Sequence, residues 1–211
     1  VEKDCGQYDS PSDVFWATGA CLMVRRSAYS GIGGLDARFF AHMEEIDLCW
    51  RLQLEGWRIC VVPESLVWHV GGGTLPNDSP WKLKLNFRNN LLMLQNNLAL
   101  TYSLEEIREL TPDKAASKAI RRAASTIRFR MLLDGMSALV YLLTGKKACF
   151  KAVWEAHREF RAMGRKPQEE QVREYATTHR TIAIPALYPG WIVSESLLRG
   201  DGIFEHLRKR I

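Results

Sequence analysis

The chain has few cysteines and no long hydrophobic run. Five cysteines in 211 residues lie far apart, without a Cys-x-x-Cys pair and odd in number; they are Cys5, Cys21, Cys49, Cys60 and Cys149. This pattern argues against a disulfide framework or structural zinc site and favours reduced thiols in a cytoplasmic compartment. No apolar stretch approaches the roughly 20 residues that span a bilayer, and the N-terminus does not resemble a signal peptide. We expect a chain that does not itself cross a membrane.

The composition, with 46% hydrophobic and 25% charged residues, is that of a globular protein. The net charge of +5 is unevenly placed, at −2 in residues 1–100 and +7 in residues 101–211. We therefore expect the basic second half to meet something anionic. The basic residues are spread over helical sequence without an aromatic platform or zinc motif, so no nucleic-acid partner is expected.

The character of the sequence changes near residue 80. Residues 13–73 are rich in β-branched residues, aromatics and glycine, and predict a strand, turn, helix, strand order, with strands in VFWATGACLMVRR and RICVVPESLVWHV. The helix is predicted in EEIDLCWRLQLEG, where apolar residues recur at helical spacing and Gly56 is a stop signal. Helical periodicity dominates from Trp81 to about Phe160, and residues 167–178 read as a linker or exposed helix.

Two of the later segments combine apolar and basic residues at helical spacing. KLKLNFRNNLLMLQNNLAL sets Leu83, Phe87, Leu91, Leu94 and Leu98 against Lys82, Lys84 and Arg88. Residues 127–160 repeat the theme with a longer apolar core, and the tail from Ile184 holds aromatics and a terminal basic cluster. Such helices either lie in a membrane interface or pack on the domain that they follow.

Three carboxylates occur within four residues at Glu44, Glu45 and Asp47. They repel one another, and burying them is unfavourable unless a cation, a proton or a metal compensates. A charged surface helix start is the plain alternative. The apolar neighbours Ile46 and Leu48 argue against it, while the helix dipole and Arg51, four residues after Asp47, would hold carboxylates ionised. We interpret this cluster as functional.

A second candidate site follows a predicted strand, at Trp68, His69 and the run from Gly71 to Thr74. Glycines let the backbone approach a ligand closely, and an imidazole binds a divalent metal or a phosphate. A lone histidine is more often an ordinary packed or surface residue.

Three blocks in this order and spacing resemble the C-terminal half of family 2 glycosyltransferases of the bacterial rhamnosyltransferase-like kind: FWATGACLMVRR, GGLDARFFAHMEEIDLCWRLQLEGWRI and PESLVWHVGGGT. The resemblance extends weakly into LNFRNNLLMLQNNL, LLDGMSALVYLLTG and IPALYPGWIV. It implies an α/β fold, namely the C-terminal part of a GT-A mixed sheet at residues 1–80 and a mostly helical, basic amphipathic extension at 81–211.

The resemblance also implies roles for individual residues. By position the general base is Glu45, although Glu replaces the commoner Asp there and Glu44 stays a second candidate. Asp47 completes the catalytic carboxylates, with Arg51 as a supporting residue at the substrate. Further substrate-binding positions are Trp16, Gly19, Ala20, Trp68 and Gly72. His69 corresponds to a ligand of the divalent metal, Mn²⁺ or Mg²⁺, that bridges the donor's diphosphate.

One departure concerns the donor side. The family's first half supplies an Asp-x-Asp type motif, which these 211 residues lack. We expect that motif upstream of Val1, and a sheet without its first strands.

The sequence thus predicts an inverting glycosyltransferase fragment, inactive alone, that acts in polysaccharide biosynthesis. It would use a nucleoside diphosphate sugar donor and a glycan or lipid-linked acceptor, and we expect it at the inner face of the cytoplasmic membrane as a peripheral protein. The alternative is a noncatalytic scaffold, or a membrane- or partner-binding module derived from a GT-A domain.

Overall fold

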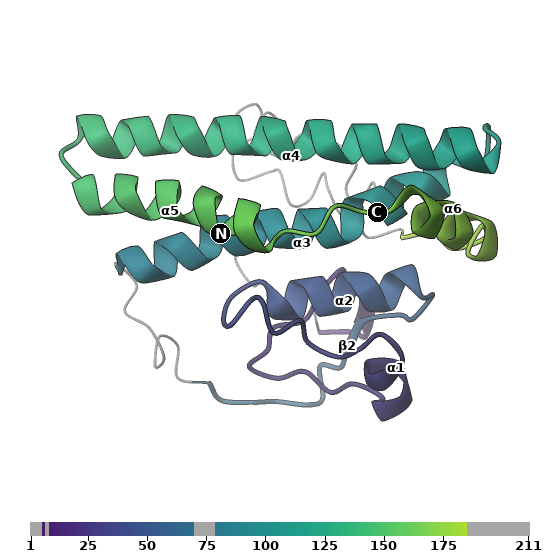
Figure 1. Ribbon diagram of the computed structural model, residues 1–211. Helices are drawn as coiled ribbons and strands as arrows, with labels where there is room; N and C mark the ends of the chain where they lie inside the picture. The colour runs from purple at the N-terminus through teal and green to yellow at the C-terminus, as the bar shows by residue number, and fades with distance from the viewer. Residues whose placement is uncertain (1–5, 7–8, 70–78, 185–211) are drawn as a thin grey trace.

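The computed structural model describes residues 6, 9–69 and 79–184, and Figure 1 shows a small irregular layer packed against a layer of long helices. The first layer contains β1 (Ser12–Asp13), α1 (Arg26–Gly31), α2 (Glu44–Leu54) and β2 (Cys60–Val61). The second contains α3 (Pro80–Glu106), α4 (Pro112–Leu143), α5 (Lys147–Met163) and α6 (Glu169–Thr178). The predicted change of character near residue 80 coincides with the start of α3.

Local sequence explains where the helices begin and end. Pro80 and Pro112 stand in the first turns of α3 and α4, where a missing backbone N–H removes no intrahelical bond. Gly56 and Gly145 follow α2 and α4 with φ of 81° and 75°, a left-handed conformation that glycine adopts without steric cost. The helix predicted at EEIDLCWRLQLEG and its stop at Gly56 are confirmed, as is the helical character of residues 81–160.

Helix α3 is the centre of the molecule, in contact with α2, α4, α5 and α6. Its side chains Leu85, Leu91 and Leu92 are fully buried. On the α2 side, Trp50 packs in the same core and donates from Nε1 to Thr101 Oγ1 at 3.0 Å. On the α6 side, the Tyr175 hydroxyl donates to the Leu54 carbonyl oxygen. Within the segment 167–178, residues 169–178 therefore form a packed helix, with Val172 and Ala176 buried.

The sheet is much smaller than the sequence predicts. Among the described residues it consists of β1 and β2 alone, antiparallel, with Ser12 opposite Val61 and Asp13 opposite Cys60. One further backbone bond, from Val14 N to Ile59 O at 2.9 Å, extends the contact. Strand β1 ends before VFWATGACLMVRR, and residues 15–25 and 62–69 have no ladder partner in the described part of the chain. A strand exists only where its backbone groups are paired.

The amphipathic reading of α3 is wrong for two of its basic residues. Lys84 and Arg88 are buried and donate to Glu159 of α5, at 2.6 and 3.0 Å. They join two helices within the protein and are not part of an exposed basic face. None of the described helices combines the length and apolar character needed to span a membrane. The predictions for Gly72 and for the tail beyond Ile184 lie outside the described residues.

Candidate active site

The carboxylate cluster lies at the start of α2, after a loop with an unusual backbone. Phe40, His42 and Met43 have φ of 64°, 69° and 71°, in the left-handed region that side chains other than glycine rarely adopt. Each such residue costs on the order of 1 kcal/mol and persists only where its surroundings enforce it. Met43 is also the N-cap of α2, so this loop sets the direction in which Glu44 and Glu45 leave the backbone.

Two neighbouring side chains of α3 hold this loop. The Asn89 amide nitrogen donates to the carbonyl oxygens of Phe39, Ala41 and His42, at 2.9, 2.7 and 2.7 Å. Arg88 Nη2 donates to the Phe39 carbonyl oxygen at 2.9 Å. Asn89 is fully buried, so the loop carbonyls have no water to replace it. The left-handed backbone before α2 is thereby fixed by α3.

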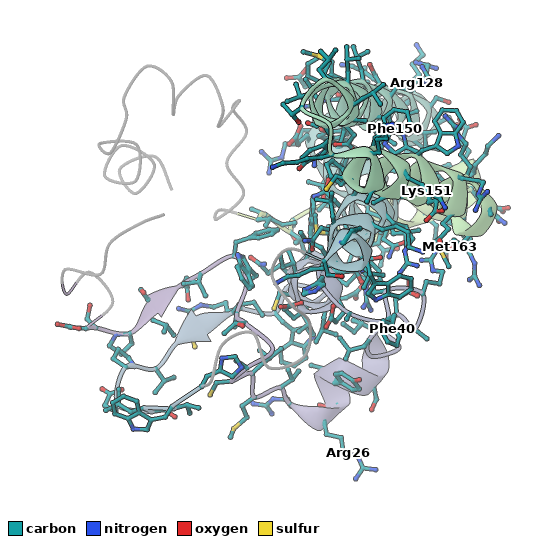
Figure 2. All side chains as sticks on the ribbon, turned by 90° about the vertical axis from the view of Figure 1, so that its left-hand side faces the viewer. Arg26, Phe40, Arg128, Phe150, Lys151 and Met163 are labelled. Atoms are coloured by element: carbon teal, nitrogen blue, oxygen red, sulfur yellow. The ribbon has the colours of Figure 1, made fainter. Side chains whose placement is uncertain are left out.

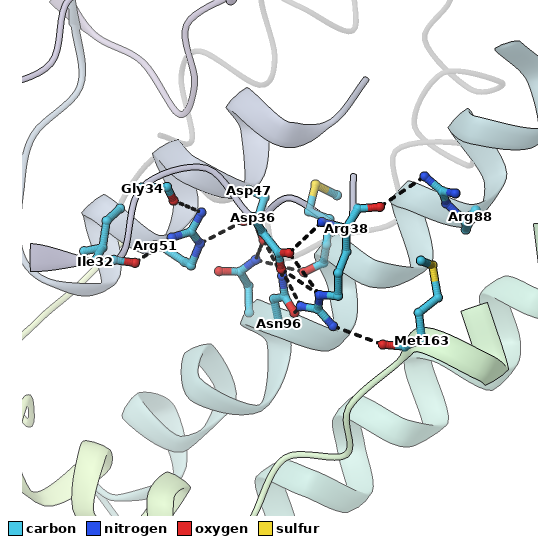
Figure 3. A network of polar contacts seen from close by, with 11 residues as sticks. Ile32, Gly34, Asp36, Arg38, Asp47, Arg51, Arg88, Asn96 and Met163 are labelled. Atoms are coloured by element: carbon cyan, nitrogen blue, oxygen red, sulfur yellow. Dashed lines mark hydrogen bonds and ion pairs between the residues drawn. The ribbon is translucent and has the colours of Figure 1, made fainter. Parts of the chain in front are cut away.

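Asp47 of α2 is completely buried, and Figure 3 shows it within the network of polar contacts with Asn96 of α3. Its Oδ1 accepts hydrogen bonds from the amides of Asn96 and Asn97, both at 2.9 Å. Its Oδ2 accepts from Arg51 Nε at 2.8 Å. Arg51 also donates to the carbonyl oxygens of Ile32 and Gly34, at 2.9 and 2.8 Å. Both oxygens of Asp47 are therefore engaged within the protein.

Arg51 also lines a shallow cleft of about 500 Å³, together with Gly34, Asp36, Arg38, Asn96 and Arg165. Arg38 binds Asp36 and donates to the Met163 carbonyl oxygen at 3.3 Å (Figure 3). Burial alone would raise the pKa of Asp36, but the hydrogen bonds and charge of Arg38 prevail and lower the pKa to about 2. Glu44 and Glu45 do not line this cleft.

Glu44 and Glu45 differ from Asp47 because no basic side chain among the described residues forms an ion pair with them. Each is half-buried, and Oε2 of each is buried without a hydrogen-bond partner among the described residues, as is Nε2 of His42. Burial raises the pKa of Glu44 above its ordinary value, and the charge of Glu45 adds to this effect. Buried polar atoms are almost always paired, so unpaired oxygens on adjacent acids are typical of a ligand or proton-transfer site.

The structure brings part of the predicted sugar-binding segment to the same place. A Cβ atom built on Gly19 would lie 3.9 Å from Glu45 Cβ and 4.0 Å from its Oε1. Burial raises the pKa of the Cys49 thiol, Glu45 contributes to this, and a backbone hydrogen bond from Ala17 opposes it. Residues 17–19 therefore lie against α2 at Glu45. Trp16 and Ala20 flank them and are exposed.

In the described part of the third block, residues 63–69, no side chain forms a hydrogen bond or ion pair with the carboxylates. Trp68 is 97% exposed, and His69 is exposed as well. Among residues 6, 9–69 and 79–184, no three side chains of His, Cys, Asp or Glu gather closely enough to hold a metal ion. The described residues alone therefore do not fit a divalent metal site.

Sequence reasoning missed the polar residues of α3. Asn89 and Asn96 are seven residues apart, as are Asn90 and Asn97, which places each pair on one side of the helix. Amides in a buried helix require hydrogen-bond partners. Their repetition at this spacing is the sequence signal that could have identified these asparagines.

Comparison with known proteins finds a matching family for the first part of the chain. The family described as glycosyltransferase like family 2 matches residues 4–91. This segment belongs to glycosyltransferase family 2. The match includes the Glu44 and Glu45 site, the loop before it and the first turns of α3 as far as the loop-binding Asn89.

Individual relatives agree with this family 2 assignment. The chain is 36% identical over 85 residues to N-acetylglucosaminyl-diphospho-decaprenol L-rhamnosyltransferase of Mycobacterium tuberculosis, covering 40% of this chain and 28% of that protein. It is 34% identical over 83 residues to rhamnosyltransferase WbbL of Escherichia coli, covering 37% and 31%. The chain thus matches less than a third of the length of these relatives. No solved structure matches significantly.

The loop clamp yields a first prediction. Replacing Asn89 by alanine leaves the Ala41 and His42 carbonyls without a donor, while the Phe39 carbonyl keeps Arg88, and we expect unfolding free energy to fall by about 2–3 kcal/mol. Urea unfolding of the two chains measures this. Asn90→Ala is the matched control, because Asn90 Oδ1 has no partner; it should cost less than about 1 kcal/mol. Equal losses in both variants would show that the loop is held by something else.

Asp36 yields a second prediction, for pH dependence. Its pKa is about 2 in the folded chain against an ordinary 3.8, so its ionised form stabilises the fold above about pH 4. This contribution is lost as the pH falls toward 2, and it amounts to no more than about 2 kcal/mol because Asp36 is partly exposed. The stability difference between the natural chain and Asp36→Asn should shrink between pH 5 and 2 in urea titrations. A constant difference would contradict the assignment.

Proposed function

We propose that this chain supplies the acceptor side of an inverting glycosyltransferase, with Glu45 as general base. The observation that carries the proposal is the pair of adjacent, half-buried acids whose Oε2 atoms have no partner among the described residues. They lie in the segment that matches glycosyltransferase family 2. A noncatalytic scaffold has no reason to keep such a pair unneutralised, because unpaired buried oxygens only destabilise it.

The reaction needs a base beside the acceptor hydroxyl. In the proposed step Glu45 takes the proton, the hydroxyl oxygen attacks the anomeric carbon, and the bond from that carbon to the diphosphate oxygen breaks. The nucleoside diphosphate leaves with the electron pair, and attack from the opposite side inverts the anomeric configuration. A carboxylate within hydrogen-bond reach of the hydroxyl contributes roughly 10²- to 10⁴-fold in such reactions.

Two local features support Glu45 over Glu44 as the base, and a third excludes Asp47. Burial and the neighbouring charge of Glu45 raise the pKa of Glu44, which disfavours Glu44 as the ionised base. Gly19 has no side chain, which keeps the space beside Glu45 Oε1 open to an acceptor. Asp47 is fully engaged with α3 and Arg51, so we assign it the positioning of α2.

The identities of the substrates are part of the proposal. We propose a nucleoside diphosphate sugar as donor and a glycan or lipid-linked acceptor, with peripheral contact to a membrane. The mycobacterial relative is named for a diphospho-decaprenol and for L-rhamnosyl transfer, which favours the lipid-linked choice and a hexose or deoxyhexose. His69 is our proposed ligand for Mn²⁺ or Mg²⁺, but no step is assigned to the ion, since the described residues do not complete a metal site.

Isosteric substitution tests the base in the full-length protein. We expect Glu45→Gln to lower kcat by about 10²- to 10⁴-fold with little change in KM, because the amide cannot accept the proton. Glu44→Gln should have a smaller effect. The matched control is Glu109→Gln, since Glu109 is exposed and outside the matched segment. Retention of full transfer rate by both Glu45→Gln and Glu44→Gln would exclude the proposed chemistry.

A further inference from the structure

Helix α4 carries an exposed apolar stripe along its second half. Its members are Leu132, Met136, Leu139, Val140 and Leu143. Their spacings of four, three, one and three residues place them on one side of the helix. Between 53% and 78% of each side chain is exposed. Apolar surface of this kind marks an interaction site.

The stripe faces away from the rest of the protein. Ala123, Asp134 and Ala138 form the buried side of α4 and lie opposite the stripe around the helix. In Figure 1 α4 is the outermost of the long helices, on the far side of α3 from α2. Next to it, α5 contributes Trp154, which is 65% exposed. The pairing of Asp134 with Arg130 and His157 fixes α5 beside α4.

The surroundings of the stripe are basic. Residues 114–151 contain nine lysines and arginines and one acid, the buried Asp134. Arg121, Arg128, Lys146 and Lys147 are exposed and have no ion pair with a described residue. In Figure 2 Arg128 on α4 and Lys151 on α5 lie at the end of the molecule away from Arg26 of α1. An apolar stripe flanked by unneutralised cations is complementary to an anionic lipid surface.

A second copy of the chain fits this surface poorly. A two-fold interface through the stripe would bring the basic end near Arg121 against the basic turn at Lys146 and Lys147 of the other copy. Like charges that face each other across an interface oppose association. An anionic bilayer provides both a hydrocarbon interior for the leucines and negatively charged headgroups for the cations.

We propose that the α4 stripe and the α4–α5 turn form a docking surface for an anionic lipid bilayer. Helix α3 runs parallel to α2, since Asn89 contacts His42 and Thr101 contacts Trp50, and α4 returns in the opposite direction. The α4–α5 turn and the start of α2 therefore lie toward the same end of the molecule. Resting on the proposed function, this surface would hold the protein at the bilayer in which a lipid-linked acceptor is anchored.

Vesicle sedimentation tests the docking surface with the 211-residue chain. We expect binding to vesicles containing phosphatidylglycerol, and binding at least about tenfold weaker to phosphatidylcholine alone or at high salt. Leu139→Asn combined with Leu143→Asn should weaken binding by about tenfold or more, because the apolar contact is lost. Lys146→Glu combined with Lys147→Glu should weaken it similarly and reduce its salt dependence. Arg26→Glu is the charge-matched control and should bind normally.

All these positions are exposed, and unchanged thermal melting shows that a variant is folded. Absence of binding by the natural chain at low salt overturns the proposal, as does normal binding by both double variants. A change of oligomeric state in the leucine variant without a change in vesicle binding also overturns it and assigns the stripe to a second copy. Transfer by the full-length protein to a water-soluble acceptor should not change in these variants, so failure of docking and failure of the Glu45 chemistry are distinguishable.

Discussion

The arrangement of the candidate site depends on one buried carboxylate. Asp47 has no contact with solvent. Hydrogen bonds from two asparagine amides of α3 and from the Arg51 guanidinium stabilise its buried carboxylate. Burial of an acid is unfavourable unless each oxygen is paired, so α2 and α3 are held in the relative position that pairs both oxygens of Asp47. It fixes α2 on α3, which in turn contacts α4, α5 and α6.

This anchor divides the roles among the three acids. Asp47 is fully engaged in holding α2 on α3. Glu44 and Glu45 are the first two residues of α2 and directly follow the left-handed loop that Asn89 of α3 holds. The contacts of Asp47 and Asn89 set the positions of these two glutamates. The site is thus pre-organised by α3, and its unpaired oxygens are left for a substrate, a proton or an ion.

The sequence predicted the parts of this arrangement that depend on local pattern. The carboxylates, the helix that begins with them and its end before Gly56 follow from spacing and from the stop signal, and the family resemblance at residues 15–74 is confirmed by the comparison. The extent of the sheet was not predictable, because a strand requires a partner that no local pattern specifies. Lys84 and Arg88 were misjudged for a similar reason, since their acid, Glu159, is more than 70 residues away in the chain.

The central claim is that Asp47 couples α2 to α3, and a double-mutant cycle between Asp47 and Asn97 tests it most directly. Unfolding free energies are measured for Asp47→Ala, Asn97→Ala and the double variant. Because both single changes break the same buried bond, the loss in the double variant should be smaller than the sum of the single losses by about 1–2 kcal/mol. Losses that add to within about 0.5 kcal/mol would contradict the account and show that the two side chains act independently.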